Sequence, residues 1–457
     1  MKIVMCASEA VPFAKTGGLA DVAGALPLAL EKLKEEVIVI MPKYKSVSHS
    51  GATIGKDVKV YFIENNKYFN RPGLYGEKTG DYPDNLERFS YFSKSALELL
   101  KKIDYKADII HCHDWQSGLV PVYLKTLYKD KPFYKKMKTA LTIHNIGYQG
   151  VFGKEEFPKL GLDWSLFNME ALEYYGKINF LKGGIAFSDI INTVSPTYSQ
   201  AIMTREQGFG MDGLLRKRRE SVFGILNGLD YDLWDPAKDK FLAKKYSADS
   251  LKDKLANKAA LQKECGLPAE EEIPLFGFVG RLAEQKGIDI LEKVLRRIYQ
   301  LGIQVVILGT GDQEYHVLLE EAAVKYPRQI RLYLKFDDAL AHRIYSGCDV
   351  FLMPSRYEPC GLGQLISFKY GTAVVASKTG GLADTVVDFD PIGQQGNGFV
   401  FENYSREGLL EAMLRAALAF HDKKIWDALI ARCAGLDFSW QESAKRYIEL
   451  YKKAIKG

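Results

Sequence analysis

The sequence lacks the patterns that mark membrane, fibrous and disordered proteins. No window approaches the roughly 20 apolar residues that a membrane-spanning helix needs. Only 16 of the 457 residues are proline, and there is no low-complexity tract. The opening peptide MKIVMCASEA carries one lysine and then Glu9 within a short apolar run, which indicates a first strand and not a signal peptide. We therefore expect a globular protein with no membrane association.

Paired cysteines and a strong charge of one sign are also missing. The six cysteines form no C-x-x-C pair, so the sequence indicates neither a zinc finger nor a disulfide framework, and it favours a cytoplasmic protein with reduced cysteines. Lys and Arg number 62 against 57 Asp and Glu, a net charge of +5. This excess is too small for a nucleic-acid-binding surface, but it allows a local site for a phosphorylated small molecule.

What the chain does contain is a repeated alternation of apolar strands and helical stretches. Runs such as VIVIMP, ADIIHCHD and TALTIHN occur in one half, and IPLFGFVGR, DVFLMPS and TAVVAS occur in the other. Continuous apolar strands indicate parallel sheets covered on both faces. We predict an α/β protein with two tandem Rossmann-like doubly wound domains and a cleft between them. The expected ranges are 1–240 and 241–430, with a helix in 431–457 that crosses back to the first domain.

The peptide KTGGLAD occurs at 15–21 and again at 378–384. The first copy follows the first strand and precedes a helix, where backbone N–H groups, Gly17, Gly18 and the Lys15 charge suit a phosphate. The alternative is an ordinary strand-to-helix turn. The second copy is interpreted as a turn that shapes the nucleotide side of the cleft or caps a helix, without chemistry of its own.

Two loops of the second half carry stronger signals. FVGRLAEQKGIDIL follows a strand and holds Arg281 and Lys286, which suit a pyrophosphate, with a solvated basic loop as the alternative. PSRYEPCGLGQL places Glu358 before a glycine-rich helix start. That carboxylate can bind sugar hydroxyls, or it can simply stabilise the helix start. In LGTGDQEY, Glu314 replaces the last glycine of a dinucleotide fingerprint, so the pattern fails.

Three histidines gather at the ends of two strands, His111 and His113 in HCHDW and His144 in TIHN. A metal site needs a third ligand that the sequence does not identify, so hydrogen bonds to sugar hydroxyls or structural bonds are preferred.

Together, KTGGLADV, HDW, TIHN, GILNGLD, GRLAEQKG and PSRYEPCGLGQL resemble the bacterial glycogen synthase and plant starch synthase family along essentially the whole chain. The resemblance implies the two-domain GT-B architecture. It also implies a retaining hexosyltransferase that moves glucose from ADP-glucose to the nonreducing 4-hydroxyl of an α-1,4-glucan, such as glycogen or a maltooligosaccharide. It implies neither a metal nor a cofactor.

The resemblance also assigns roles to residues. Arg281 and Lys286 stabilise the departing diphosphate, Glu358 binds the donor glucose, and the His144 backbone carbonyl lies near the anomeric carbon. The implied substrate-binding positions are Lys15, Thr16, Gly17, Gly18, Asp114, Asn145, Asn227, Phe336, Cys360, Gly361, Leu362 and Gly363.

Three positions depart from the family pattern. Gly363 stands where threonine is frequent, Ile366 stands where related retaining enzymes have a second glutamate, and Phe336 replaces a tyrosine that stacks on the base. A single carboxylate is enough if the leaving phosphate itself takes the acceptor proton on the same face of the sugar. The choice between ADP-glucose and UDP-glucose stays open.

Three other classes of protein are alternatives to the glucan synthase. A sugar-nucleotide epimerase on the same fold would release nucleotide and sugar without any glucan, and a dehydrogenase would need the intact nicotinamide fingerprint that is missing. A noncatalytic glucan-binding homologue has no use for Lys15, Arg281, Lys286 and Glu358 as a pyrophosphate clamp.

Overall fold

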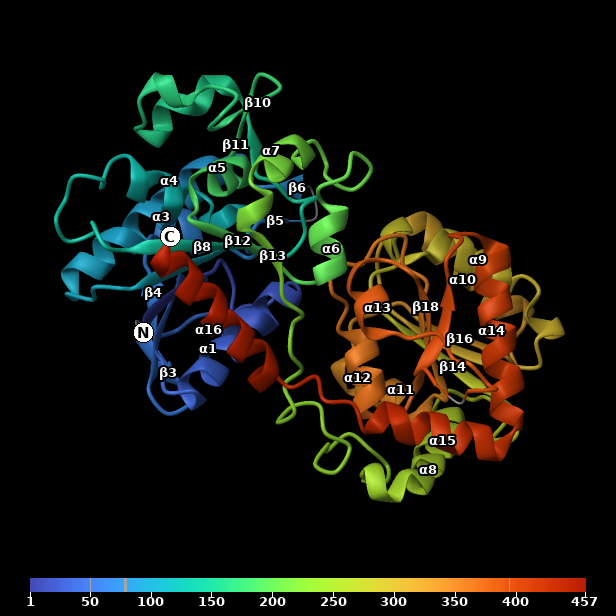
Figure 1. The fold of residues 1–457 in the computed structure, drawn as a ribbon. Coiled ribbons are helices and arrows are strands. Elements are labelled where there is room, and N and C mark those ends of the chain that lie inside the picture. Colours follow the sequence, from blue (N-terminus) through green and yellow to red (C-terminus); the bar gives the residue numbers. More distant parts are fainter. Residues whose placement is uncertain (50, 78–79, 394) are drawn as a thin grey trace. The chain divides into compact units, whose positions relative to one another are not determined.

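A computed structural model describes residues 1–49, 51–77, 80–393 and 395–457. The chain forms two compact units, one made of Met1–Gly228 with Trp440–Gly457 and the other of Leu229–Ser439. Each unit is a mainly parallel sheet with helices on its two faces (Figure 1). These divisions differ from the expected 1–240, 241–430 and 431–457, because the segment from residue 229 packs with the second unit.

The sheet of the first unit has the strand order β13-β12-β8-β7-β1-β2-β4-β3. All neighbouring strands run parallel except the β3 and β4 edge pair, which is antiparallel. The central strands are buried almost along their whole length, because helices cover both of their faces. The strands are β1 (Lys2–Cys6), β2 (Glu36–Pro42), β3 (Gly51–Ile54), β4 (Val58–Ile63), β7 (Ile109–His113), β8 (Lys138–Ile143), β12 (Ile190–Thr193) and β13 (Val222–Gly224).

Helices and two small sheets complete this unit. The helices are α1 (Gly18–Lys32), α2 (Asn66–Phe69), α3 (Asn85–Lys102), α4 (Leu119–Lys125), α5 (Phe180–Phe187), α6 (Pro196–Ala201), α7 (Asp212–Lys217) and α16 (Trp440–Lys456). The small sheets contain β5 (Gly76–Glu77), β6 (Gly80–Asp81), β9 (Val151–Phe152), β10 (Glu173–Tyr174) and β11 (Lys177–Asn179). The antiparallel β3 edge and these small sheets were not predicted from the sequence.

The last helix, α16, returns to the unit in which the chain begins. It lies beside α1, so both termini belong to the first unit (Figure 1). Its buried stripe includes Tyr447 and Tyr451, whose hydroxyls reach polar side chains of the sheet. The C-terminal segment therefore supplies part of the layer beneath the carboxyl ends of β7 and β8.

The second unit has the sheet order β16-β15-β14-β17-β18-β19, with every neighbouring pair parallel. The strands are β14 (Leu275–Val279), β15 (Gln304–Leu308), β16 (Ile330–Tyr333), β17 (Val350–Met353), β18 (Ala373–Ser377) and β19 (Gly398–Phe401). The helices are α8 (Lys254–Glu264), α9 (Ile288–Leu295), α10 (Gln313–Lys325), α11 (Asp338–Gly347), α12 (Gly363–Lys369), α13 (Gly380–Thr385), α14 (Arg406–His421) and α15 (Lys423–Ala434). The predicted pair of Rossmann-like units is confirmed.

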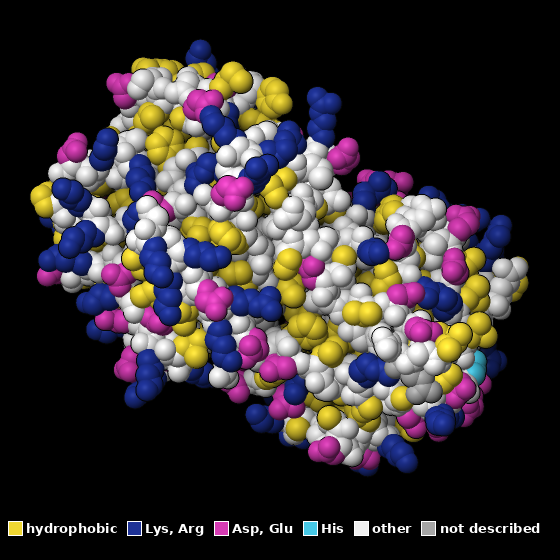
Figure 2. All heavy atoms as spheres, viewed as in Figure 1, with side chains coloured by type: hydrophobic (Ala, Val, Ile, Leu, Met, Phe, Trp, Pro, Cys, Tyr) yellow, Lys and Arg dark blue, Asp and Glu magenta, His cyan; other side chains and the backbone are white. Residues whose placement is uncertain are grey.

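The surface and the cysteines fit the composition. Lys and Arg side chains lie among Asp and Glu side chains across the face drawn in Figure 2, and the net charge of the whole chain is only +5. All six cysteines are buried free thiols. Among the described residues, no helix combines the length and apolar character needed to cross a membrane.

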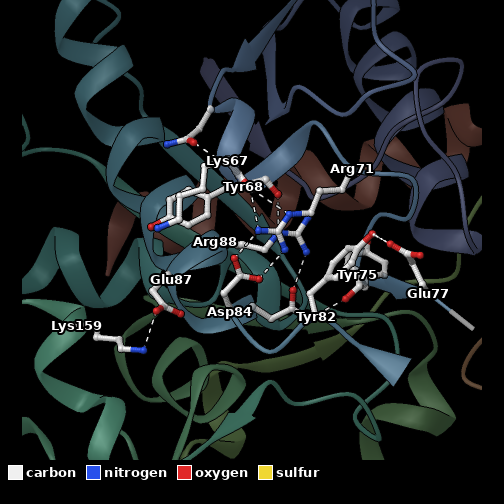
Figure 3. A network of polar contacts seen from close by, with 12 residues as sticks. Lys67, Tyr68, Arg71, Tyr75, Glu77, Tyr82, Asp84, Glu87, Arg88 and Lys159 are labelled. Carbon is white, nitrogen blue, oxygen red and sulfur yellow. Dashed lines mark hydrogen bonds and ion pairs between the residues drawn. The ribbon is translucent and has the colours of Figure 1, made fainter. Parts of the chain in front are cut away.

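A buried arginine organises the connection between β4 and α3 in the first unit (Figure 3). The Arg88 guanidinium is fully buried and donates to the carbonyl oxygens of Tyr68 (2.7 Å) and Leu74 (2.8 Å) and to Asn85 Oδ1 (2.6 Å). Beside it, Arg71 forms two bonds to the Asp84 carboxylate, at 2.7 and 2.6 Å. The bonds from Arg88 to Tyr68 and Leu74 satisfy loop carbonyls that would otherwise be buried without a donor.

The substitution Arg88→Met tests this anchoring. It leaves buried carbonyl groups unsatisfied, so we expect the free energy of unfolding to fall by about 3 kcal/mol in urea denaturation. Arg71→Met is the matched control, because its ion pair is partly exposed and worth about 1 kcal/mol. Equal losses in the two variants would contradict the role given to Arg88.

Candidate active site

Glu358 is the centre of the polar cluster in the second unit. It lies in the loop between β17 and α12 and is 6% exposed. One carboxylate oxygen, Oε2, accepts hydrogen bonds from Lys286 Nζ at 2.6 Å and from Ser355 Oγ at 3.0 Å. A buried carboxylate is tolerated only where a charge and hydrogen bonds compensate it, so Lys286 is its structural counterion.

Lys286 comes from the loop that follows β14, in the short helical turn Glu284–Lys286. That turn is bound to the Glu358 loop, since the Arg356 backbone N–H donates to the Gln285 carbonyl at 2.9 Å. The Arg356 side chain adds an ion pair to Glu284 at 2.8 Å. Arg281 is exposed on the same loop. The two basic residues predicted to face a pyrophosphate thus stand on a loop tied to the carboxylate predicted to face the sugar.

The second KTGGLAD peptide packs directly beneath Glu358. Gly381 N–H donates to the Glu358 carbonyl at 3.1 Å, and the Ser377 hydroxyl donates to the Ser355 carbonyl. Gly380 has φ +42°, and a Cβ there would overlap the Glu358 carbonyl oxygen. This copy therefore supports the loop that carries the carboxylate, a contact that the sequence did not reveal.

The predicted residues that directly follow Glu358 include Cys360, Gly361 and Gly363. Cys360 is 4% exposed, and its carbonyl and that of Gly361 accept hydrogen bonds from Gln364 Nε2. A Cβ at Gly363 would lie 2.9 Å from the Phe351 ring, so a threonine there requires a shift of that ring.

Two further positions lie away from the carboxylate contacts. Ile366 is 5% exposed on α12 and belongs to the hydrophobic core. Phe336 is 86% exposed, before α11, and no contact to the Glu358 cluster is found for it within the described ranges.

In the first unit, the KTGG loop closes around an internal carboxylate. Glu9, 3% exposed, accepts a hydrogen bond from the Thr16 backbone N–H and bonds at 2.9 and 3.0 Å from the Thr16 hydroxyl. Burial raises the pKa of Glu9, while hydrogen bonds from Thr16, Tyr75 and the Gly17 backbone N–H oppose that rise. Two N–H groups of the predicted anion cradle therefore face Glu9.

The neighbours of this loop are also fixed. Tyr75 donates to Glu9 at 3.0 Å, and its own carbonyl accepts a bond from Asn85, which in turn accepts a bond from Arg88. Lys15 is exposed and pairs with Asp21 at 2.7 Å. Sequence reasoning missed Glu9 and Tyr75, although a glutamate directly after an apolar strand was a visible signal for the first.

Asp114 follows β7 in a strained backbone conformation, with φ +54° and ψ −167°. Non-glycine residues in this region cost about 1–3 kcal/mol and cluster at functional sites. Its Oδ1 accepts the His144 backbone N–H at 2.7 Å. Burial raises the pKa of Asp114 to about 7, against the lowering effect of hydrogen bonds from His144 and Asn145.

The three histidines lie ring against ring, with His111 and His113 buried and His144 half-buried. His113 Nδ1 lies 3.0 Å from His144 Nε2, and the His111 and His113 rings are 4.2 Å apart. His111 bonds the Tyr451 hydroxyl at 2.8 Å and the Thr142 hydroxyl at 2.6 Å. Burial lowers the pKa of His111 and of His144 to about 3, so the stack is neutral at physiological pH. Throughout the described ranges, no group of three or more His, Cys, Asp or Glu could hold a metal ion.

A groove of about 720 Å³ opens next to Trp115, the residue after Asp114. Its walls combine aromatic rings with polar groups. They include Asp81, Tyr82, Trp115, Tyr148, Gln149, Phe152, Tyr174 and Phe209. Aromatic faces beside hydrogen-bonding groups are suited to a sugar chain. Asn227, near the end of the first unit's main segment, is 6% exposed, and its buried Oδ1 has no partner among the described residues.

Two Rossmann-like units, one with a basic loop beside a buried carboxylate and one with a lysine and paired glycines after its first strand, fit a glycosyltransferase. Comparison with family models agrees. Residues 2–217 match the starch synthase catalytic domain, and residues 262–419 match the glycosyl transferases group 1 model.

The chain belongs to the glycogen synthase and starch synthase family. It is 48% identical to a glycogen synthase of Geotalea daltonii and 43% identical to one of Thermotoga maritima, in each case over 100% of this chain and 99% of the relative. The solved structure of the catalytic domain of starch synthase IV from Arabidopsis thaliana, bound to ADP and acarbose, has a TM-score of 0.91 at 37% identity over 100% of this chain and 99% of that one. A sucrose-phosphate synthase from Thermosynechococcus elongatus, at 18% identity and TM-score 0.67, shares the fold. The family predicted from the sequence motifs is confirmed.

Alanine at the two KTGG peptides should separate their roles. A Cβ on Gly17 meets nothing within 4 Å, so Gly17→Ala should leave the free energy of unfolding within about 0.5 kcal/mol of the parent and act only on donor KM. Gly380→Ala should destabilise by about 1–3 kcal/mol, because its φ is positive and Glu358 is displaced. Urea denaturation and donor titrations give both quantities, and a stable, fully active Gly380→Ala variant would disprove the supporting role.

The raised pKa of Asp114 predicts a pH-dependent stability. Between the usual pKa of 3.8 and about 7, the folded protein keeps a proton that the unfolded chain releases, so Asp114 makes stability fall as pH rises. Asp114→Asn removes this term. We expect its free energy of unfolding, relative to the parent, to improve by about 2–4 kcal/mol between about pH 4 and about pH 8. Urea denaturation at both pH values measures it, and a difference independent of pH would show that Asp114 has an ordinary pKa.

Proposed function

We propose that the protein transfers glucose from ADP-glucose to the nonreducing 4-hydroxyl of an α-1,4-glucan, with retention at the anomeric carbon. Membership of the glycogen synthase and starch synthase family supports the reaction class. The related starch synthase IV of Arabidopsis binds ADP and acarbose, which supports this donor nucleotide and an oligosaccharide acceptor. The observation that carries the proposal is the pairing of Lys286 with the buried Glu358 carboxylate at 2.6 Å.

Lys286 and Arg281 act on the leaving group. Negative charge grows on the diphosphate as the glycosidic bond breaks, and cations fixed in place before the reaction stabilise that charge without reorganisation. Lys286 supplies a point charge, and Arg281 can bind two oxygens at once. Because Lys286 already contacts Glu358, it connects the phosphate end of the donor to the sugar end.

Glu358 holds the donor glucose. With one oxygen occupied by Lys286 and Ser355, the carboxylate keeps acceptor capacity for sugar hydroxyl groups. The glycines of the second KTGGLAD peptide fix the height of its loop. The backbone of Cys360, Gly361, Leu362 and Gly363 completes the proposed contacts to sugar and phosphate in this unit.

The reaction proceeds on one face of the sugar. Ile366 is a core residue, so the position where related retaining enzymes have a second glutamate offers no carboxylate. The leaving phosphate oxygen therefore takes the proton from the acceptor hydroxyl as the new bond forms. His144 contributes its backbone carbonyl near the anomeric carbon, and Asp114 and Asn145 line the glucose site.

The first unit binds the donor phosphate and the acceptor. Lys15, beside Thr16, Gly17 and Gly18, is the cation proposed for the donor phosphate. Asn227 is proposed to contact the sugar nucleotide through its side chain, because its buried Oδ1 has no partner within the described ranges. The aromatic groove beside Trp115 is proposed for the glucan chain. Phe336, exposed for 86% of its surface, is proposed to stack on the base. A reducing cytoplasmic setting is proposed from the six free cysteines.

A nucleotide-release assay tests the proposed reaction. Purified protein is incubated with ADP-glucose or UDP-glucose, with and without glycogen, and with and without EDTA. We expect ADP release that depends on glycogen and is unaffected by EDTA. Faster release from UDP-glucose would reassign the donor, and release of nucleotide and sugar without glucan would replace the synthase with an epimerase.

Substitution of Lys286 and Glu358, singly and together, tests the pair. Lys286→Ala leaves a buried carboxylate without its counterion, so we expect a loss of about 1–3 kcal/mol in unfolding free energy and about 100-fold in kcat. Glu358→Gln should lose activity by a similar factor with a smaller change in stability. In the double variant, stability should recover while activity stays lost.

Arg356→Ala is the matched control, because it removes two neighbouring ion pairs, to Glu284 and Asp289, on the exposed side of the same loops. Its kcat should stay within about threefold of the parent. Additive stability losses in the double variant would contradict the direct pairing, and wild-type kcat for Lys286→Ala would remove Lys286 from the reaction.

A further inference from the structure

The hydrogen bond between His113 and His144 restricts where their protons lie. His113 Nδ1 and His144 Nε2 are 3.0 Å apart, and both rings are neutral at physiological pH because burial lowers both pKa values. A neutral imidazole carries one N–H, and this hydrogen bond needs one donor and one acceptor. Two arrangements are therefore possible, with either His113 or His144 as donor.

The far side of His113 distinguishes the two arrangements. His113 is fully buried, and its Nε2 has no hydrogen-bond partner among the described residues. If His144 donated, His113 would carry its proton on Nε2 as a buried N–H without an acceptor, an arrangement that native proteins rarely tolerate. If His113 donates from Nδ1, only a lone pair is left unpaired, which is the less costly state.

We propose that His113 is a positioning residue that holds His144 in the tautomer with its proton on Nδ1, so that His144 presents this N–H to an oxygen atom of the bound sugar. In the described part of the chain, His144 Nδ1 has no protein partner, and the side chain is only half-buried. The sugar as ligand rests on the proposed function; the tautomer rests on the hydrogen bond alone.

The surroundings keep this arrangement in place. His111 stacks on His113 and is itself fixed by the hydroxyls of Tyr451 on α16 and Thr142 on β8. The Tyr447 ring of α16 also packs against the His111 ring in a tilted arrangement, with 5.6 Å between the ring centroids. The carboxylate of Asp114 accepts the His144 backbone N–H. The negative charge of Glu9, in the loop after β1, raises the pKa of Asp114. The packed elements thus provide two neutral histidines, two tyrosines and two carboxylates around His144.

Selective ¹⁵N-histidine NMR tests the tautomer directly, since the chain has only seven histidines. In the ligand-free protein at about pH 7.5, His144 should show a protonated Nδ1 and an unprotonated Nε2, with the signal assigned by its loss in His144→Asn. In His113→Leu, which removes the donor, the His144 signals should shift to those of mixed tautomers. The proposal is wrong if the native enzyme shows a protonated Nε2, or if His113→Leu leaves the His144 signals unchanged.

Kinetics test the consequence for substrate binding. His113→Leu should lower kcat/KM for the sugar donor about tenfold, the effect of one hydrogen bond, and His113→Gln, whose amide can donate to His144, should recover part of it. Cys112→Ala is the control for packing, because this buried neighbour on β7 points to the other face of the strand. An equal loss in Cys112→Ala at the same thermal midpoint would overturn the specific role. A correct tautomer in a protein without glucosyl transfer would instead count against the proposed function alone.

Discussion

A buried carboxylate placed just after a parallel strand is the interaction on which this structure's polar loops depend. Glu9 follows β1, Asp114 follows β7 and Glu358 follows β17, and each is less than a tenth exposed. These groups are largely removed from solvent, so each needs donors from neighbouring loops. Glu9 gathers the KTGG loop, Asp114 gathers the His144 segment, and Glu358 gathers Lys286. The carboxylates thereby fix the loops whose remaining donors are proposed to bind substrate.

Acidic residues at the amino ends of the strands connect neighbouring elements of the same unit. Asp349 precedes β17, accepts the Leu275 backbone N–H at 2.8 Å and pairs with the buried Lys258 at 2.7 Å. Asp189 precedes β12 and accepts two bonds from Thr139 together with an ion pair from Lys125. These groups join neighbouring elements within a unit. At the carboxyl ends of the strands, by contrast, exposed Lys15 and half-buried Lys286 stand on the loops that the buried carboxylates hold, at the end of the sheet where open α/β folds bind ligands.

The repeated KTGGLAD peptide shows how far sequence reasoning can go. Both copies were predicted as strand-to-helix turns. Each leads from a strand into a helix, the first into the long helix α1 and the second into the short helix α13. Identical residues nevertheless face different environments: Gly17 faces open space, whereas Gly380 lies against the Glu358 carbonyl. The pairing of His113 with His144 was equally out of reach, because nothing in HCHDW or TIHN specifies which ring nitrogens meet or that Tyr451, from the last helix, supports them.

The sequence by itself determined the family, the two Rossmann-like units and the residue types of the candidate site, because apolar periodicity and ordered motifs are local properties of the chain. Only the tertiary structure decided which charges are paired, which donors already have acceptors and which glycines are in contact with the carboxylate loop. Those are relations between segments far apart in sequence, such as Lys286 with Glu358 and Glu9 with Tyr75. Burial sets their energies, and burial depends on every element packed around a group.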